Sequence, residues 1–371
     1  MALSLIFDGN YLFYKTLFIF GGYGKKGEKV LSDKVSQEMF IRKIATDMSH
    51  AIRTFGNPNK VVFTIDSRSW RKEIEIEEGG YKSNREKDES IIDWDSFYKC
   101  MNEFGEILQR KGFIVSREER AEGDDLMYLW ADRFYEDGQD SVIITGDKDL
   151  TQCIKFNGKN FIVVYNPNSK TRKIVAAKGF QKWLKSEDYD LFDASTFMNR
   201  SKDLIQEALS SVVIEEIDPD YLIFEKVITG DAGDTVPPIW TWESKGKTFR
   251  VTPTKAIRMY EIMQMSKPIT DVIDLPSRAL EVANGINATC KQIAPEAAIK
   301  SRLERNLKLV YLDKRIIPTE IQEAFEVAYN GDSNRKELSA QVYDMVHLLE
   351  GTRFISGGKT FEADIFSHFK F

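Results

Sequence analysis

The stretch LSLIFD at residues 3–8 is a short apolar run that ends in an aspartate, and it sets the pattern for the first half of the chain. Comparable apolar runs predict buried strands at 60–65, 112–115, 141–145 and 161–165. Helical patterns lie between these runs near 35–55, 94–110 and 122–137. Strands that alternate with helices of this length predict an α/β fold, in which helices cover both faces of a mostly parallel sheet.

The pattern changes in the second half of the chain. From about Asp218 the strand patterns fade, and helical patterns separated by proline and glycine follow. No internal repeat is evident. We therefore predict a first domain at 1–185, a bridge or insertion at 186–217, a helical second region at 218–350 and a C-terminal tail at 351–371.

Composition argues against several classes of protein. The three cysteines lie far apart without CxxC spacing, against a disulfide framework or a zinc site, and the three histidines are too scattered for catalysis centred on histidine. The apolar run from Leu3 to Phe20 contains polar residues and has no basic leader, so we predict neither a signal peptide nor a membrane span, and a cytoplasmic protein. The net charge of -6 is unfavourable for binding phosphates, but catalytic carboxylates would lower the sum and hide basic patches.

Acidic residues follow three of the predicted strands. Asp8 ends LSLIFD, Asp66 ends VVFTID, and both Asp147 and Asp149 follow VIITG. Open parallel sheets hold their ligands outside the carboxyl ends of the strands, so these acids should converge at one edge. Each acid has an ordinary alternative interpretation as a loop residue, a turn or a helix cap.

A further acidic motif, AEGDDL at 121–126, opens a predicted helix and contains Glu122, Asp124 and Asp125. Taken alone, these acids would only complement the helix dipole. Their occurrence beside three other acidic sites favours a metal site, because converging like charges are costly without a cation. Ligands that are all oxygen atoms indicate Mg²⁺, with Mn²⁺ as a substitute.

Six segments occur in order over the first two thirds of the chain: IFDGN at 6–10, TIDSRSWR at 64–71, YKSNREK at 81–87, AEGDDL at 121–126, TGDKDLTQ at 145–152 and TGDAGDTVP at 229–237. Together they resemble the motifs of the 5' nucleases, which include flap endonucleases, the nuclease domain of bacterial DNA polymerase I and bacteriophage ribonuclease H. The resemblance implies a PIN-like sheet with a helical arch at 67–92. It also implies two Mg²⁺ ions, one held by Asp8, Asp66, Glu122 and Asp124, the other by Asp125, Asp147, Asp149 and Asp231, with Asp234 in the outer shell.

The resemblance also gives roles to residues of the arch, through which a single-stranded 5' end would pass. Lys82 and Arg85 would reach the scissile phosphate, and Tyr81 would stack on a base. Further contacts to the nucleic acid would come from Arg68, Arg71 and Lys72. By charge alone, a solvated loop is the preferred interpretation of this segment.

The chain departs from the family after the last motif. IWTWESKGKTFRVTPTKAIRMY at 239–260 is longer and more aromatic than the family's helical hairpin, whose glycines are not evident, and so the family's potassium site has no support here. We expect its basic residues Lys245, Lys247, Arg250 and Lys255 to contact duplex DNA. The alternative for each is a place on a solvated loop.

This insertion and RNLKLVYLDKRIIP at 305–318 are most similar to the ribonuclease H of T-even bacteriophages. That similarity implies a monomeric phage enzyme in the host cytoplasm that removes RNA primers during DNA replication. It would act as a 5' to 3' exonuclease and flap endonuclease on branched or nicked duplex DNA and RNA:DNA hybrids, by two-metal hydrolysis with a metal-activated water.

Two alternative functions are a PIN-type endoribonuclease and a catalytically dead, structure-specific DNA-binding protein. YKSNR and TGDAGD argue against the first, and the complete set of acidic ligands argues against the second. The tail EADIFSHFKF contains Phe366, Phe369 and Phe371. These aromatics either dock on the helical region or anchor the enzyme to a sliding clamp or single-strand-binding protein.

Overall fold

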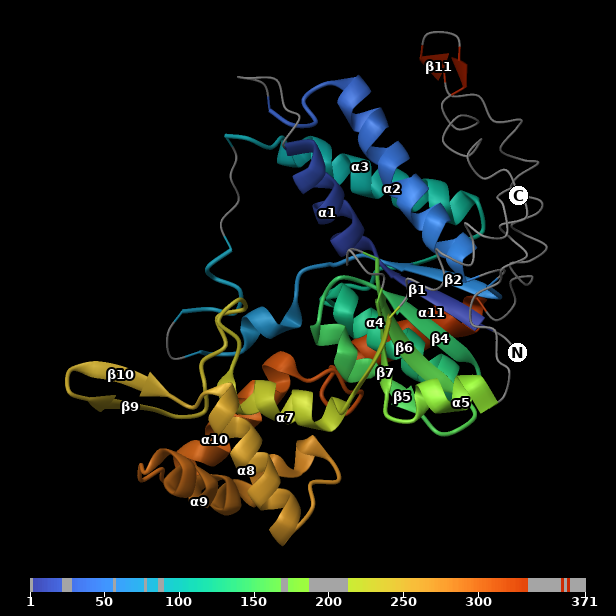
Figure 1. Cartoon of the computed structure of the whole chain (residues 1–371). Coiled ribbons are helices and arrows are strands. Elements are labelled where there is room, and N and C mark those ends of the chain that lie inside the picture. The colour runs from blue at the N-terminus through green and yellow to red at the C-terminus, as the bar shows by residue number, and fades with distance from the viewer. Residues whose placement is uncertain are drawn as a thin grey trace. The chain divides into compact units, whose positions relative to one another are not determined.

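The computed structural model describes residues 3–21, 29–55, 58–76, 79–85, 90–167, 173–186, 213–332, 355–356 and 359–360. The chain divides into two compact units (Figure 1). The first comprises Met1–Ser67, Lys87–Ile217 and Glu320–Phe371, and the second comprises Arg68–Glu86 and Asp218–Thr319. Each unit is described by itself.

A mostly parallel sheet forms the centre of the first unit. Its described strands are β1 Leu3–Asp8, β2 Lys60–Thr64, β3 Ile114–Ser116, β4 Asp140–Ile144, β5 Lys155–Phe156, β6 Phe161–Asn166, β7 Lys173–Ala177 and β8 Val213–Ile217. Their order is β3-β2-β1-β4-β6-β7-β8, with β5 also paired to β6. Only β5 and β7 run antiparallel to β6; the other described pairs are parallel. The predicted α/β class and the five predicted strands are confirmed.

Helices cover both faces of this sheet (Figure 1). On one face lie α1 Gly9–Gly21, α2 Lys34–Thr54 and α3 Trp94–Arg110; on the other lie α4 Gly123–Glu136 and α11 Thr319–Asp332. A short helix, α5 Phe180–Ser186, follows β7. The helices predicted near 35–55, 94–110 and 122–137 are confirmed as α2, α3 and α4. Helix α1 was not predicted, because its residues continue the apolar run of β1 without a turn signal.

The alternation of side chains along β1 determines the face of the sheet to which Asp8 points. Leu5 and Phe7 belong to the core between the sheet and α1, α2 and α3, where Phe13 and Phe40 also pack. Because successive strand residues point to opposite faces, Asp8 points to the face that α4 covers. A one-residue shift in register would move Asp8 into the aromatic core, so the apolar pattern fixes its direction.

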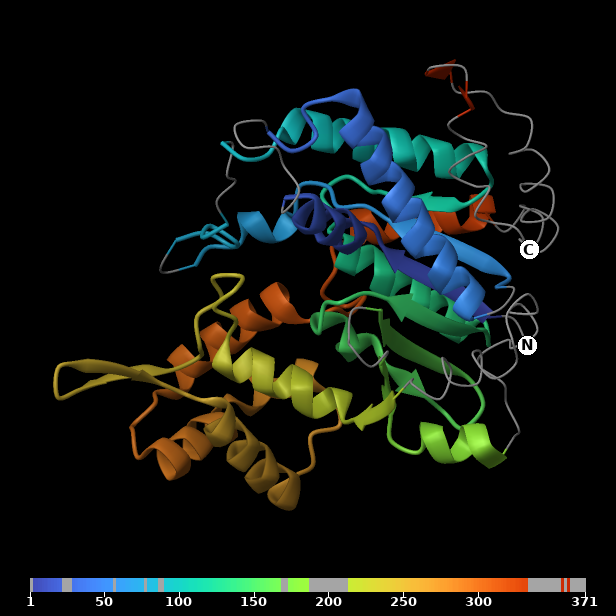
Figure 2. The same ribbon diagram turned by 45° about the horizontal axis from the view of Figure 1, so that its top comes forward.

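The second unit is mainly helical. Its larger segment begins at Asp218 like the helical region expected at 218–350, but the residues from Glu320 onward fall in the first unit, and Arg68–Glu86 of the expected arch falls in the second. Its described elements are η1 Trp70–Glu73, α7 Pro219–Thr229, β9 Thr241–Ser244, β10 Lys247–Arg250, α8 Pro253–Ser266, η4 Val272–Arg278, α9 Ala279–Cys290 and α10 Glu296–Val310. The antiparallel hairpin of β9 and β10 was not predicted. It extends away from the helices of its unit (Figure 2).

Three predicted segments are only partly described. The stretch 186–217 contributes β8, which pairs with β7, and its residues 187–212 lie outside the described residues. The predicted arch, 67–92, contains η1 and a turn at 81–84 among its described residues. In the tail, β11 Ile355–Ser356 pairs with β12 Lys359–Thr360, while Phe366, Phe369 and Phe371 lie outside the described residues.

Among the described residues, no helix has the length and apolar character needed to cross a membrane.

Candidate functional site

The carboxylate of Asp8 lies at the carboxyl end of β1 and connects two neighbouring strands. Its Oδ1 accepts a hydrogen bond from the backbone N–H of Tyr11 at 2.8 Å, in the first turn of α1. Its Oδ2 accepts one from the hydroxyl of Thr145 at 2.7 Å, directly after β4. Asp8 is therefore buried and fixed in direction by donors from both sides.

Asp66 follows β2 and contacts the beginning of α4. Its backbone N–H donates to Oδ1 of Asn10 at 3.2 Å, and its own Oδ1 accepts from the backbone N–H of Gly123 at 2.5 Å. A Cβ atom on Gly123 would lie only 2.9 Å from this Oδ1. Glycine is thus needed for the close approach of the helix to the carboxylate.

Glu122 and Asp125 form a capping box at the N-terminus of α4, where Oδ2 of Asp125 accepts from the backbone N–H of Glu122 at 3.1 Å. Both side chains are buried. This pair therefore caps the helix, a role that was not assigned to it from the sequence and that does not exclude a second role. Asp124, in the same turn, is half-buried.

Asp147 and Asp149 follow β4 and are tied to the same network. The backbone N–H of Asp147 donates to the Thr145 hydroxyl at 3.0 Å, and that of Asp149 donates to Oδ1 of Asp147 at 2.9 Å. Asp147 is exposed, whereas Asp149 is half-buried at the start of η2 Asp149–Cys153. Thr145 thereby joins Asp8 to the loop that carries this acidic pair.

The electrostatics show that these acids influence one another. Burial is the main cause that raises the pKa of Asp8, to about 7; the negative charges of Asp66 and Asp147 add to the rise, and the hydrogen bonds from Tyr11 and Thr145 oppose it. A nearby cation would relieve this cost of ionisation. The three strand ends therefore bring their carboxylates close enough to interact, as predicted from the parallel sheet.

The donor set fits a hard divalent cation. All seven acids predicted here offer only oxygen atoms, which Mg²⁺ and Mn²⁺ prefer. A carboxylate has about four lone-pair sites, so an orienting N–H or O–H donor is compatible with a bound cation. The seven acids of this unit are Asp8, Asp66, Glu122, Asp124, Asp125, Asp147 and Asp149.

Asp231 and Asp234, the other predicted acids, lie in the loop after α7 in the second unit. Burial alone would raise the pKa of Asp231, but the Lys226 ammonium at 2.9 Å and the N–H of Gly233 lower it below its ordinary value. Asp234 instead contacts the predicted arch residues: Oδ1 lies 2.5 Å from Arg85, and Oδ2 lies 3.8 Å from the ammonium of Lys82.

The predicted nucleic-acid residues differ widely in exposure. Arg71 and Tyr81 are buried, Arg71 with its guanidinium over the ring of Trp70 and Tyr81 in the core of the second unit, so neither is placed to touch a base in this arrangement. Lys255 is half-buried and donates to the carbonyl of Thr289. The remaining five are exposed: Arg68, Lys72, Lys245, Lys247 and Arg250.

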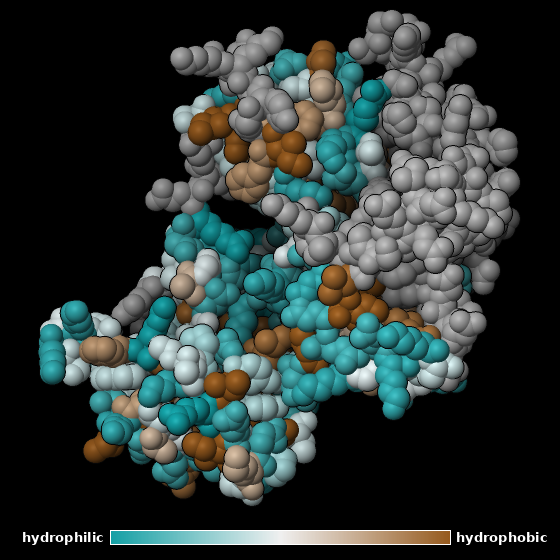
Figure 3. Space-filling view, viewed as in Figure 1, coloured by the Kyte–Doolittle hydropathy of each residue, from teal (hydrophilic) through white to brown (hydrophobic). Residues whose placement is uncertain are grey.

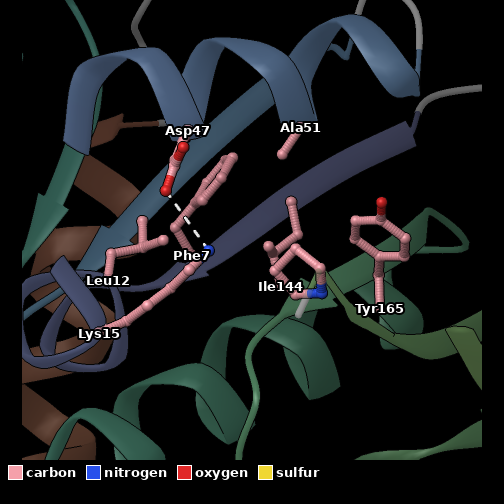
Figure 4. Close-up of a pocket in the computed structure, with 8 residues that line it drawn as sticks. Phe7, Leu12, Lys15, Asp47, Ala51, Ile144 and Tyr165 are labelled. Atoms are coloured by element: carbon pink, nitrogen blue, oxygen red, sulfur yellow. Dashed lines mark ion pairs between the residues drawn. The ribbon is translucent and has the colours of Figure 1, made fainter. Parts of the chain in front are cut away.

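A separate cavity of about 130 Å³ lies in the first unit on the opposite side of β1 from Asp8 (Figure 4). Phe7, Leu12, Ile144 and Tyr165 contribute to its wall, and an ion pair between Lys15 and Asp47 at 3.4 Å closes one side. Since Phe7 points away from the face that carries Asp8, this cavity is no part of the carboxylate cluster.

Sequence reasoning missed the residues that orient the acids. Thr145 was quoted only as part of TGDKDLTQ, and Tyr11 was not singled out, although a hydroxyl or N–H donor next to a strand-end acid is a recognisable signal. Lys226 was also missed, because its contact with Asp231 depends on how α7 ends.

Comparison with known proteins found one family match, to the 5'-3' exonuclease, N-terminal resolvase-like domain, over residues 3–185. A search of curated proteins found no match. A bacteriophage T5 flap endonuclease in a pseudo-enzyme-product complex with DNA and metal ions is similar at 17% identity and a TM-score of 0.46, covering 93% of this chain and 98% of that chain. T5 5'-exonuclease with bound zinc is similar at 16% identity and a TM-score of 0.48, and the match covers 88% of this chain and 98% of that chain. Both TM-scores lie below 0.5, so the likeness to a family rests on the match over residues 3–185 alone.

Proposed function

We propose that this chain, which belongs to the 5' nuclease superfamily through the 5'-3' exonuclease domain at residues 3–185, hydrolyses phosphodiesters at 5' ends and 5' flaps of DNA and RNA:DNA hybrids. The observation that carries the proposal is the geometry of the acidic cluster: hydrogen bonds from Tyr11 and Thr145 fix the buried carboxylate of Asp8 at the end of β1, and Thr145 also holds the loop that carries Asp147. Such a cluster is stable when cations neutralise it.

The acids would hold two Mg²⁺ ions, with Mn²⁺ as a substitute. One set of ligands is Asp8, Asp66, Glu122 and Asp124, and the other is Asp125, Asp147, Asp149 and Asp231, with Asp234 outside the inner shell. When bound, such cations supply Lewis-acid stabilisation of the charge that develops on the phosphate. The chain's own contribution is to fix the carboxylates through Tyr11, Thr145 and Gly123, so that little reorganisation is needed.

Lys82 and Arg85 would bind the scissile phosphate and offset its developing negative charge. Support comes from their position in the turn that follows Gly80, where both charges meet one carboxylate, that of Asp234. A phosphate oxygen is an acceptor of the same charge and similar geometry, so it is a suitable replacement for that carboxylate.

The hairpin of β9 and β10 would contact the duplex. It is mostly hydrophilic on its surface (Figure 3) and carries Lys245, Lys247 and Arg250 against a single acid, Glu243. Its turn at Lys245 and Gly246, with φ of 52° and 69°, is the kind that matches the twist of two paired strands. A two-stranded ribbon of this kind fits the major groove of B-DNA, and its charge favours phosphates. Arg68 and Lys72 are further candidates.

The finer assignment is RNA primer removal in phage DNA replication by a monomeric enzyme in the host cytoplasm. It rests on the similarity of 239–260 and 305–318 to T-even ribonuclease H. The tail would bind a sliding clamp or single-strand-binding protein and raise the local concentration of nuclease. Deletion of residues 360–371 should abolish stimulation by a clamp and leave cleavage of a bare flap unchanged. Full stimulation of the truncated enzyme would contradict the anchor.

The activity is tested with purified protein and Mg²⁺ on 5'-labelled flap, nicked duplex and RNA:DNA hybrid. We expect release of short 5' products from all three substrates, and none from Asp8→Asn. Asp47→Asn is the matched control, because it removes a half-buried carboxylate on the opposite face of the same sheet. Cleavage only of single-stranded RNA would favour a PIN-type endoribonuclease, and duplex binding without cleavage would favour a DNA-binding protein.

A further inference from the structure

The turn that carries Lys82 and Arg85 is attached to the loop after α7 within the second unit. The backbone N–H of Lys82 donates to the carbonyl of Asp234 at 3.0 Å, and the side-chain amide of Asn84 donates to the carbonyl of Ala232 at 3.2 Å. The loop itself is closed by paired backbone hydrogen bonds between Asp231 and Val236, both at 2.8 Å. Two fixed turns therefore meet along their backbones.

Side chains converge on the carboxylate of Asp234 at this contact. Oδ2 accepts from the hydroxyl of Tyr81 at 3.3 Å and lies 3.8 Å from the ammonium of Lys82, while Oδ1 lies 2.5 Å from Arg85. The Lys82 ammonium also lies 4.8 Å from the centre of the Tyr81 ring. One carboxylate thus orients an aromatic residue and two cations from a single turn.

Burial distinguishes this arrangement from a surface ion pair. The side chains of Asp234 and Lys82 are 16% and 14% exposed, whereas Arg85 is 61% exposed. Lys82 has a φ of 57°, a left-handed conformation that is unusual for a residue with a Cβ atom. Such a conformation persists where surrounding contacts fix it, and the Asp234 backbone and side chain provide those contacts.

We propose that Asp234 is a positioning residue, which holds Lys82 and Arg85 in place to receive the scissile phosphate. This inference rests on the proposed nuclease function. Asp234 acts through Lys82 and Arg85. It fixes their turn before substrate binds, and the two cations then exchange part of their contact with Asp234 for contact with the phosphate. The exposed Arg85 meets the phosphate first, and Lys82 remains held by the backbone hydrogen bond to Asp234.

The test compares Asp234→Asn with Asp271→Asn on a 5' flap in Mg²⁺. Asp271 is the matched control, since its carboxylate also pairs with an arginine of the second unit, Arg315 at 2.5 Å. We expect kcat of Asp234→Asn to fall by roughly 10- to 100-fold with little change in KM, because misplacement of a reacting group by about 1 Å costs about 100-fold. Asp271→Asn should keep the wild-type kcat.

The decisive readout is whether the effects of substitutions add. If Asp234 works through the two cations, Asp234→Asn should cost nothing further in a protein that already carries Lys82→Ala and Arg85→Ala. A full additional loss would overturn the proposal. Titration with Mn²⁺ tests the alternative that Asp234 is a metal ligand. Equal Mn²⁺ affinity of wild type and Asp234→Asn supports the positioning role, whereas loss of a binding site in Asp234→Asn would make Asp234 a metal ligand.

A milder variant keeps the proposal testable if Asp234→Asn does not fold. Tyr81→Phe removes only the hydroxyl that donates to Asp234, and we expect kcat to fall by about fivefold, the equivalent of one hydrogen bond. An unchanged kcat would contradict the role of this network. If wild-type protein cleaves none of the substrates, the proposed function itself fails; a working wild type with unaffected Asp234→Asn refutes only the positioning role.

Discussion

Substitution of Gly123 by alanine should displace the carboxylate of Asp66 while it changes the stability of the fold only slightly. The added Cβ would lie 2.9 Å from Oδ1 of Asp66, and ordinary contact begins at 3.4 Å, so the carboxylate must move by about 0.5 Å. The nearest atom is the end of a side chain, so the shift is cheap for the fold. Alanine is also favoured over glycine in helices by about 1 kcal/mol. We therefore expect a net stability change of at most about 1 kcal/mol.

Catalysis should respond more strongly than stability. If a displacement of 1 Å costs about 100-fold, 0.5 Å costs about tenfold. The assay measures the rate of flap cleavage in Mg²⁺, the affinity for Mn²⁺ and the Tm of Gly123→Ala. Gly331→Ala is the control, since this glycine of α11 has open space for a Cβ and should keep full activity.

The reasoning is refuted by a wild-type rate and a wild-type Mn²⁺ affinity in Gly123→Ala. It is also refuted if the loss of activity follows a loss of several kcal/mol in stability, because the side chain of Asp66 would then not have absorbed the shift.

Asp147→Asn should abolish cleavage and leave duplex binding, measured by anisotropy, largely intact; wild-type turnover would remove Asp147 from the site. Joint replacement of Lys245 and Lys247 by alanine should reduce the slope of log affinity against log salt by about 2, and an unchanged slope would place the hairpin away from DNA. Burial raises the pKa of Asp313, but hydrogen bonds from Arg315 outweigh burial and lower the pKa below its ordinary value. The ionised Asp313 therefore stabilises the fold above the unfolded pKa of about 3.9, and this stabilisation is lost as the pH falls through the lower folded pKa. The Tm of Asp313→Asn should accordingly fall less steeply than that of wild type between about pH 4 and pH 2, and parallel curves would contradict this.

The parts of the fold that depend on the local pattern of apolar residues could be predicted from the sequence. Apolar runs predicted the strands, and the acids that end β1 and β2 could be placed at one edge because parallel strands share a direction. In the structure, the negative charges of Asp66 and Asp147 are among the causes that raise the pKa of Asp8. These inferences needed only the order of residues along each strand.

Contacts between distant segments were not predictable in the same way. Tyr81 looked like an exposed aromatic of a charged loop, yet it packs in the core of the second unit and donates to Asp234, 153 residues away. Arg71 is buried over Trp70 for a similar reason. The hairpin after Trp240 was also missed, because its alternation is short and surrounded by helical patterns.

The most direct test of the account is calorimetric titration of Mn²⁺ into wild type and Asp8→Asn at neutral pH. Asp8 belongs to a cluster of carboxylates whose combined charge we propose is neutralised by a cation. We expect Mn²⁺ to bind wild type and to bind Asp8→Asn at least about tenfold more weakly, with an unchanged fold of the variant by circular dichroism. Equal affinity for both proteins would contradict the assignment of this cluster as the metal centre.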